Sequence, residues 1–78
     1  MKTTLYQKKA ELEILETLLF SCDNLKEENE NSIAYSKQEL ENPDTPDWRK
    51  DYAQKDIENA TYKLKALEKI REYLEKLI

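Results

Sequence analysis

The absence of glycine is the sequence feature that most constrains what this chain can fold into. None of its 78 residues is Gly, and its only two prolines, Pro43 and Pro46, lie within one short stretch. Gly is the usual residue for tight β-hairpin turns, so a chain without it is poorly suited to an antiparallel sheet. Pro interrupts helices more strongly than any other residue. The sequence therefore predicts two helical arms joined by a loop at residues 42–46.

Composition supports an all-α fold, because the commonest residues are Glu, Leu and Lys, which are strong helix formers. We expect a single helical domain over residues 1–78, with a first arm at about residues 4–41 and a second helix at about residues 46–77. At the start of the second helix, Thr45 is the expected cap and Pro46 the expected first helical residue. Asp47 complements the positive end of the helix dipole.

Apolar residues recur with heptad spacing along both arms, and we call the resulting stripe on each arm its seam. The first seam comprises Leu5, Lys8, Leu12, Leu15, Leu19, Cys22, Lys26, Asn29, Ile33, Ser36 and Leu40. The second seam comprises Ala53, Ile57, Ala60, Leu64, Leu67, Arg71, Leu74 and Ile78. Heptad spacing is typical of helices that pack lengthwise against each other. The sequence therefore predicts an antiparallel helical hairpin of two long helices.

Further apolar residues flank both seams and make the stripe wider than one neighbouring helix can cover. They include Tyr6, Ile14, Leu18, Phe20, Tyr62, Ile70, Tyr73 and Leu77. Exposed apolar stripes mark interaction surfaces. We therefore expect the hairpin to be completed by dimerisation into an antiparallel four-helix bundle, or by docking on another protein.

A break in the first arm near residues 21–24 is the alternative fold. Four residues of lower helix propensity adjoin there, and Asn24 with Glu27 resembles a capping box. A break would give a three-helix bundle. Its two short helices would each rise less than about 30 Å beside a third of about 48 Å, whereas a hairpin matches the ends better.

Antiparallel folding about Asp44 brings residue i beside roughly residue 88 − i, which pairs the Leu-rich ends of the two arms. A polar layer at Lys26 and Asn29, with Asn59 nearby, would fix the register at some cost in stability. Aromatic residues at the loop end either pack internally or anchor a partner. The candidate protein-interaction residues are Leu12, Leu15, Leu19, Leu67, Ile70, Leu74, Trp48 and Tyr52.

The sequence lacks side chains that catalytic and metal sites commonly use. The chain has no His, so Cys22 has no imidazole base beside it, and its seam position predicts a small buried residue. Asp23, Glu27, Glu28 and Glu30 lack the Gly and the alternating spacing of a calcium loop. We expect no catalytic residue, no metal site and no cofactor, and therefore no enzyme.

Charge is uneven along the chain. Residues 23–47 carry eight acids and two Lys, for a net charge of −6, and Glu27, Glu28 and Glu30 form a candidate acidic face. Such a face could imitate the phosphates of nucleic acid, as an inhibitor encoded by a phage or mobile element would. Lys63, Lys65 and Arg71 alternate with Glu at intrahelical pairing distances, so direct nucleic-acid binding is not expected.

Trp48 directly follows the loop, and a helical hairpin with this placement is similar in shape to the Trp-X-Gly family of small secreted hairpins, which carry a Trp between two helices. The sequence departs from that motif, because the chain has no Gly and Arg49 follows the Trp. The resemblance implies a secretion substrate or chaperone as a third alternative.

The leading functional hypothesis is a non-enzymatic protein–protein interaction module that acts as an adaptor, regulator or inhibitor through a helix face. The longest apolar run is Leu18-Leu19-Phe20, far below the ~18 residues of a membrane span, and no secretory signal is evident. A single Cys suits a reducing compartment. We therefore expect a cytoplasmic protein with no membrane association, a protein partner and a homodimeric state.

Overall fold

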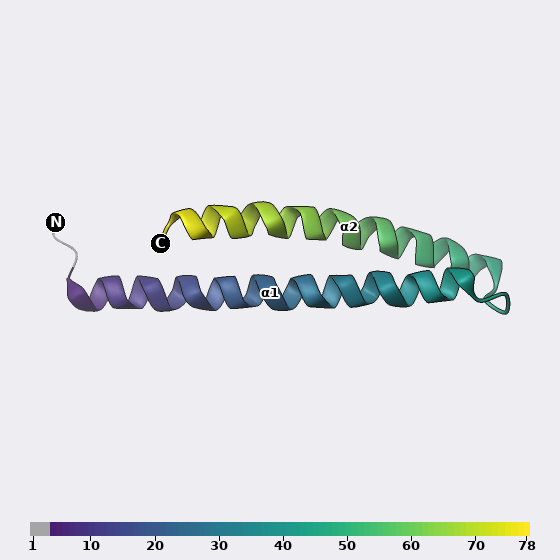
Figure 1. The fold of residues 1–78 in the computed structure, drawn as a ribbon, viewed down its shortest axis with the longest axis horizontal. Helices are drawn as coiled ribbons and strands as arrows, with labels where there is room; N and C mark the ends of the chain where they lie inside the picture. Colours follow the sequence, from purple (N-terminus) through teal and green to yellow (C-terminus); the bar gives the residue numbers. More distant parts are fainter. Residues whose placement is uncertain (1–3) are drawn as a thin grey trace.

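The computed structural model describes residues 4–78, and these form two helices and no strand. Helix α1 covers Leu5–Glu41 and helix α2 covers Asp47–Lys76. They run antiparallel and side by side as a hairpin (Figure 1). The predicted all-α hairpin is confirmed, and the alternative break near residues 21–24 is wrong. Seam residues Leu19 and Cys22 hold this segment against α2, and such packing outweighs a few residues of low helix propensity.

Helix α1 begins with a capping box that the expected element bounds did not anticipate. The backbone N–H of Gln7 donates to Thr4 Oγ1 at 3.1 Å, and the N–H of Thr4 donates to Gln7 Oε1 at 2.8 Å. Two backbone donors that the first helical turn leaves unpaired are thereby satisfied. The signal is visible in the sequence as a Thr followed three residues later by a Gln.

The connection between the helices turns without any residue in the left-handed region. Asn42 caps α1, its carbonyl accepts from the N–H of Thr45 at 3.2 Å, and its side-chain Oδ1 accepts from the N–H of Asp44 at 3.0 Å. No residue of the described chain has a positive φ angle. Asn at the first and Pro at the second turn position suit a type I turn, which needs no Gly.

The predicted start of the second helix is wrong in its details. The N-cap is Pro46, with φ −61° and ψ 152°, and no side chain caps it. Thr45 is not the cap because its backbone belongs to the preceding turn, where its N–H is bonded to Asn42. The Pro46 carbonyl accepts from the N–H of Lys50 at 3.0 Å, so the helix proper begins at Asp47.

The predicted seams form the contact between the helices over about residues 15–40 of α1 and 53–74 of α2, whereas the seam residues Leu5, Leu12 and Ile78 are exposed. The residues with the least exposed surface are all small, namely Cys22, Ser36, Ala53 and Ala60. Large seam residues, including Leu15, Leu19, Ile33, Leu40, Ile57, Leu64, Leu67 and Leu74, are half-buried. No large side chain among the described residues is fully buried. Each helix has only one neighbour in the hairpin, so the outer edge of its seam stays in contact with solvent.

The hairpin is a thin rod with unequal arms. Its principal extents are 63 × 15 × 14 Å, and its radius of gyration is 18.5 Å, against about 11.5 Å for a compact domain of this length. Helix α1 has 37 residues and α2 has 30, so α1 is longer by about 10 Å. The N-terminal end of α1 therefore projects beyond the end of α2 (Figure 1), which leaves Leu5 and Tyr6 exposed.

Within the described residues, neither helix contains a stretch long and apolar enough to cross a membrane.

Candidate functional site

The two sides of the seam differ in chemistry, and we call them the charged flank and the apolar face. A groove on the charged flank is lined by Asp23, Lys26 and Glu30 of α1 and by Lys65, Glu68 and Arg71 of α2. Acidic and basic side chains are equal in number there. Opposite charges on neighbouring turns reduce the net field that a bound ligand would experience.

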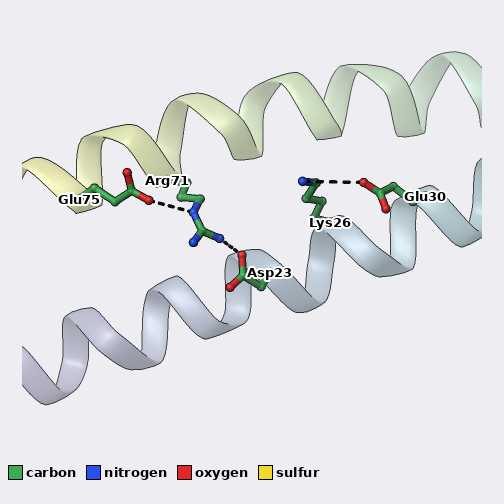
Figure 2. Close-up of polar contacts among 5 residues, drawn as sticks. All are labelled: Asp23, Lys26, Glu30, Arg71 and Glu75. Carbon is green, nitrogen blue, oxygen red and sulfur yellow. Dashed lines mark hydrogen bonds and ion pairs between the residues drawn. The ribbon is translucent and has the colours of Figure 1, made fainter.

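Ion pairs link the side chains of the charged flank (Figure 2). Arg71 of α2 contacts Asp23 of α1 across the groove and donates from Nε to Glu75 Oε1 at 3.0 Å. Lys26 Nζ lies 4.0 Å from Glu30 Oε1, one turn along α1. These side chains are about half exposed to solvent, and exposed pairs each contribute at most about 1 kcal/mol. In these pairs, the carboxylates of Asp23, Glu30 and Glu75 are already bound to basic side chains of the protein.

The apolar face lies on the other side of the seam and comprises Ile14, Leu18, Leu25, Ile70, Tyr73 and Leu77. Spacings of four and seven residues place the three α1 members on one side of that helix. On α2, Ile70 and Leu77 point in nearly the same direction, and Tyr73 lies at the outer edge of the face, toward the side of α2 that carries Tyr62. Leu25 and Ile70 line a common groove that runs between the helices. These six side chains are 44–66 % exposed. Both helices therefore contribute exposed large apolar residues to this side of the hairpin, with Glu28 and Lys63 beside Leu25 and Ile70 in the groove.

This face occupies only part of the rod. We call residues 4–22 and 63–78 the open half, because they lie away from the connection, and residues 23–62 the loop half. Five of the six residues of the apolar face belong to the open half, and Leu25 lies at its edge. On the same side of the loop half, a second groove is lined mainly by polar residues, including Ser32 and Asp56, together with the exposed Tyr35. Tyr52, about five turns before Ile70 on α2, faces this side as well, so the loop half carries aromatic but no aliphatic residues on this face apart from Leu25.

The candidate interaction residues from the sequence fall into three groups in the structure. Leu15, Leu19, Leu67 and Leu74 are half-buried in the seam. Ile70 belongs to the apolar face, and Leu12 is exposed near the end of the hairpin. Trp48 and Tyr52 lie at the opposite end of the rod, beside the connection.

The sequence placed Leu18, Ile70 and Leu77 in the wide stripe that flanks the seams, and Leu25 was not singled out. None of the four was assigned to one particular surface. The signal for a surface is present, because each of the four stands one position before a seam position. Two residues seven apart repeat their direction on a helix, so the same offset on both arms marks a single side of the hairpin. Tyr73 and Ile14 lie one turn away from these positions on the same side.

The aromatic residues at the loop end are exposed. The rings of Trp48 and Tyr52 meet edge to face, with centroids 6.2 Å apart and an interplanar angle of 81°, and Lys55 Nζ lies 6.0 Å from the Tyr52 centroid. Tyr35 and Tyr62 are exposed too. The expectation of internal packing for these rings is not met, because the seam beneath them is filled by Ile33, Leu40 and Ile57.

The candidate acidic residues do not gather on one surface. Glu30 lines the groove of the charged flank, Glu28 lines the groove of the apolar face, and Glu27 lines neither. Successive residues on a helix point about 100° apart, so a run of acids is spread around α1. In residues 4–78, no three His, Cys, Asp or Glu side chains are placed to hold a metal ion.

A second ion pair between the helices lies at the loop end. Arg49 of α2 donates to Glu39 of α1 through Nε and through Nη2, the latter to Oε1 at 2.8 Å. The Glu39 side chain is only 14 % exposed. The pKa of Arg49 is raised above its usual value, mainly by the hydrogen bond to Glu39 and by the attraction of that carboxylate. The residue numbers of this pair sum to 88, as the expected register requires.

The expected polar layer is satisfied mostly within α1. Asn29 Nδ2 donates to the carbonyl of Leu25 at 2.7 Å, one turn back along its own helix. Asn59 lines the same shallow groove as Asn29, as the register predicts. Because the Asn29 donor is used internally, the ion pairs at Glu39 and Asp23 are the polar contacts that bridge the two helices.

The lone thiol, Cys22, is 8 % exposed in the seam, which confirms its predicted placement as a small buried residue. Cys22 lines the groove of the charged flank together with Lys26 and Arg71, but the sequence has no His that could act as its base. No protein-family model matches this chain, and it matches neither a curated protein nor a solved structure.

Proposed function

We propose that this chain is a protein–protein interaction module that binds through the apolar face of its hairpin. The observation that carries the proposal is the one-sided placement of six exposed large apolar side chains from two helices. Contiguous apolar surface of this kind costs free energy in water and marks sites where another surface docks. A helical surface suits the shallow groove between Leu25 and Ile70, because ridges of side chains pack into such grooves.

A binding role without catalysis is part of the proposal. Cys22 lies in the seam, the sequence has no His, and the grooves beside the seam are open at the surface. Catalytic sites are usually concave and bury most of a bound ligand. A flat apolar face is instead suited to another polypeptide.

Paired substitutions at two exposed positions of α2 test the proposal. Ile70→Lys places a charge in the apolar face, whereas Tyr62→Lys places the same charge on the outer side of α2, where Tyr62 is 71 % exposed. We expect Ile70→Lys to abolish self-association and the capture of proteins from an extract of the source organism, with helical circular dichroism unchanged. Tyr62→Lys should leave both intact. Equal behaviour of the two variants in both assays would contradict the proposal.

The acidic loop half supports a second candidate, an inhibitor that imitates nucleic acid. Residues 23–62 carry eleven acids and five basic residues, a net charge of −6. A protein that binds nucleic acid would be attracted to this end of the rod, and the attraction would weaken with salt. In this case Glu27→Gln, Glu28→Gln and Glu30→Gln together would abolish partner capture while Ile70→Lys would not. The opposite pattern supports the apolar face.

A further inference from the structure

We infer that the occupant of the apolar face is a second copy of this chain, which packs open half against open half in antiparallel orientation. The inference rests on the proposed function and names the partner of that same surface. In the resulting dimer, four helices surround a common core over the open halves, and the two loop halves project in opposite directions. Three observations support it, namely the exposed area, the distribution of charge and the position of the face along the rod.

The exposed area of the hairpin matches what a stable homodimer buries. The chain exposes 6718 Å², whereas a compact monomer of 9.3 kDa exposes about 5,000 Å². The excess is about 1,700 Å² for each chain. Obligate homodimers bury about 1,000–2,500 Å² on each subunit. A second copy is therefore a partner of sufficient size to cover what the hairpin leaves open.

The core of the open half is incomplete in a way that a second hairpin would complete. Leu15, Leu19, Leu67 and Leu74 are half-buried between α1 and α2, and the six residues of the apolar face border them on one side. Two copies related by a two-fold axis bring identical faces together, so every apolar residue meets another apolar surface. The side chains at the seam edge then become the core of a four-helix bundle.

Charge decides the orientation of the two copies. The open half has seven basic and six acidic residues in residues 4–22 and 63–78, a net charge of +1, whereas the loop half has a net charge of −6. A parallel dimer would align two loop halves side by side, at a separation comparable with the screening length of about 8 Å. An antiparallel dimer keeps them at opposite ends. Like-charge repulsion therefore favours the antiparallel arrangement.

The position of the face makes the two arrangements distinguishable by distance. Along α1 the face extends from Ile14 to Leu25, so a two-fold axis through its centre passes near residue 20. The connection lies about 35 Å from this axis, so the two connections of an antiparallel dimer are about 70 Å apart. In a parallel dimer they lie about 10–20 Å apart, since packed helices are separated by 8–10 Å.

Spin labels on the connection test the inference directly. In a Cys22→Ala background, which removes the natural thiol, Asp44→Cys provides one labelling site on the exposed turn. Double electron–electron resonance on the labelled full chain should give one distance of about 70 Å. Adding Ile70→Lys should abolish this dipolar signal, and adding Tyr62→Lys should preserve it. Circular dichroism of each labelled variant checks that the hairpin is still folded.

A distance of about 10–20 Å would overturn the antiparallel orientation. Absence of any dipolar signal at high protein concentration, with a monomeric mass, would overturn the second copy as occupant. If the monomer still captured another protein in an Ile70-dependent manner, the proposed function would stand without this inference. If neither self-association nor capture depended on Ile70, both would fail.

Discussion

At the scale of single residues, small side chains in the seam determine how closely the helices approach. Ala53 has no exposed surface and Ala60 and Ser36 have almost none, whereas their large neighbours in the seam stay partly exposed. Ser36 of α1 and Ala53 of α2 stand within one position of the register in which residue numbers sum to 88, so small side chains face each other across this part of the seam. Near the loop, the hairpin is therefore sensitive to any increase in side-chain volume.

Substituting Ala53→Leu tests this sensitivity. We expect a loss of about 1–3 kcal/mol in the free energy of unfolding, because the larger side chain forces the helices apart. Ala34→Leu is the matched control, since Ala34 is exposed on α1 and both changes keep a strong helix former. Urea unfolding followed by circular dichroism at one fixed protein concentration measures both. Equal effects of the two substitutions would show that Ala53 is not a point of close contact.

The Glu39–Arg49 pair is the less exposed of the two ion pairs that bridge the helices. Because the pKa of Arg49 is raised, its contribution to stability is fully present below the ordinary pKa of arginine. That contribution is lost only as the pH rises through the raised value. At any lower pH, Arg49 stays protonated and binds the largely buried carboxylate of Glu39.

Glu39→Gln should lower the midpoint of thermal unfolding, because it removes the negative charge and replaces one of the two acceptor oxygens with an NH2 group, which cannot accept from the guanidinium. The matched control is Glu41→Gln. Glu41 is the last residue of α1, and its carboxylate is exposed and close to the negative end of the helix dipole. Removing that charge should leave the midpoint unchanged or raise it slightly. Differential scanning calorimetry compares the two variants, and a lower midpoint for Glu41→Gln alone would refute the assignment.

At the scale of elements, the connection makes a tight turn without Gly by using an Asn side chain in place of a backbone group. Asn42 accepts from Thr45 through its carbonyl and from Asp44 through its side chain. An Asx turn of this kind stabilises the reversal, and Pro43 restricts the backbone beside it. The turn therefore depends on Asn42 more than on any other residue of the connection.

Asn42→Ala should cost about 0.5–1.5 kcal/mol of unfolding free energy, the usual net contribution of one hydrogen bond. Asn31→Ala, in the exposed middle of α1, serves as the control. It should be neutral or stabilising by up to about 0.7 kcal/mol, because Ala has the higher helix propensity. Urea denaturation distinguishes the two outcomes. If Asn42→Ala changed the free energy of unfolding no more than Asn31→Ala does, the Asn42 side chain would not stabilise the turn. Pro43 and Pro46 alone would then determine its shape.

The unequal length of the helices predicts a gradient of local stability along α1. Residues 5–11 project beyond α2 and depend on the Thr4 capping box alone, whereas residues 29–40 face α2 across the tightest part of the seam. Backbone amides of residues 9–12 should therefore exchange with solvent at least about tenfold faster than those of residues 29–36. Hydrogen exchange followed by mass spectrometry measures the difference, and uniform protection along α1 would contradict it.

At the scale of the whole molecule, heptad spacing together with the position of the prolines was sufficient to predict the hairpin, its seam and the buried Cys22. Details that depend on single backbone groups were not predictable in this way. Thr45 has the right side chain for a cap, but the turn at Asn42 uses its backbone, and Pro46 takes the cap position instead. Leu18 and Leu25 stand one position before seam residues, and this offset places them on the exposed surface and not between the helices.

The apolar face could be foreseen only in part because a surface built from two helices requires their register. Ile70 was a candidate protein-interaction residue that flanks the seam, and the register of the two helices places it in one surface groove with Leu25. Glu28 and Glu30 are close in sequence, yet they line grooves on opposite sides of the seam. In both cases the direction of the side chain around the helix axis, rather than its residue type, determines its role.

The mass of the chain in solution tests most directly the central claim that the apolar face is an interface covered by a second copy. Sedimentation equilibrium over a range of concentrations should give twice the monomer mass of 9.3 kDa for the natural sequence and for Tyr62→Lys. Ile70→Lys should give the monomer mass, with its helices retained. A natural chain that stays monomeric at every concentration, or an Ile70→Lys variant that still dimerises, would contradict the claim.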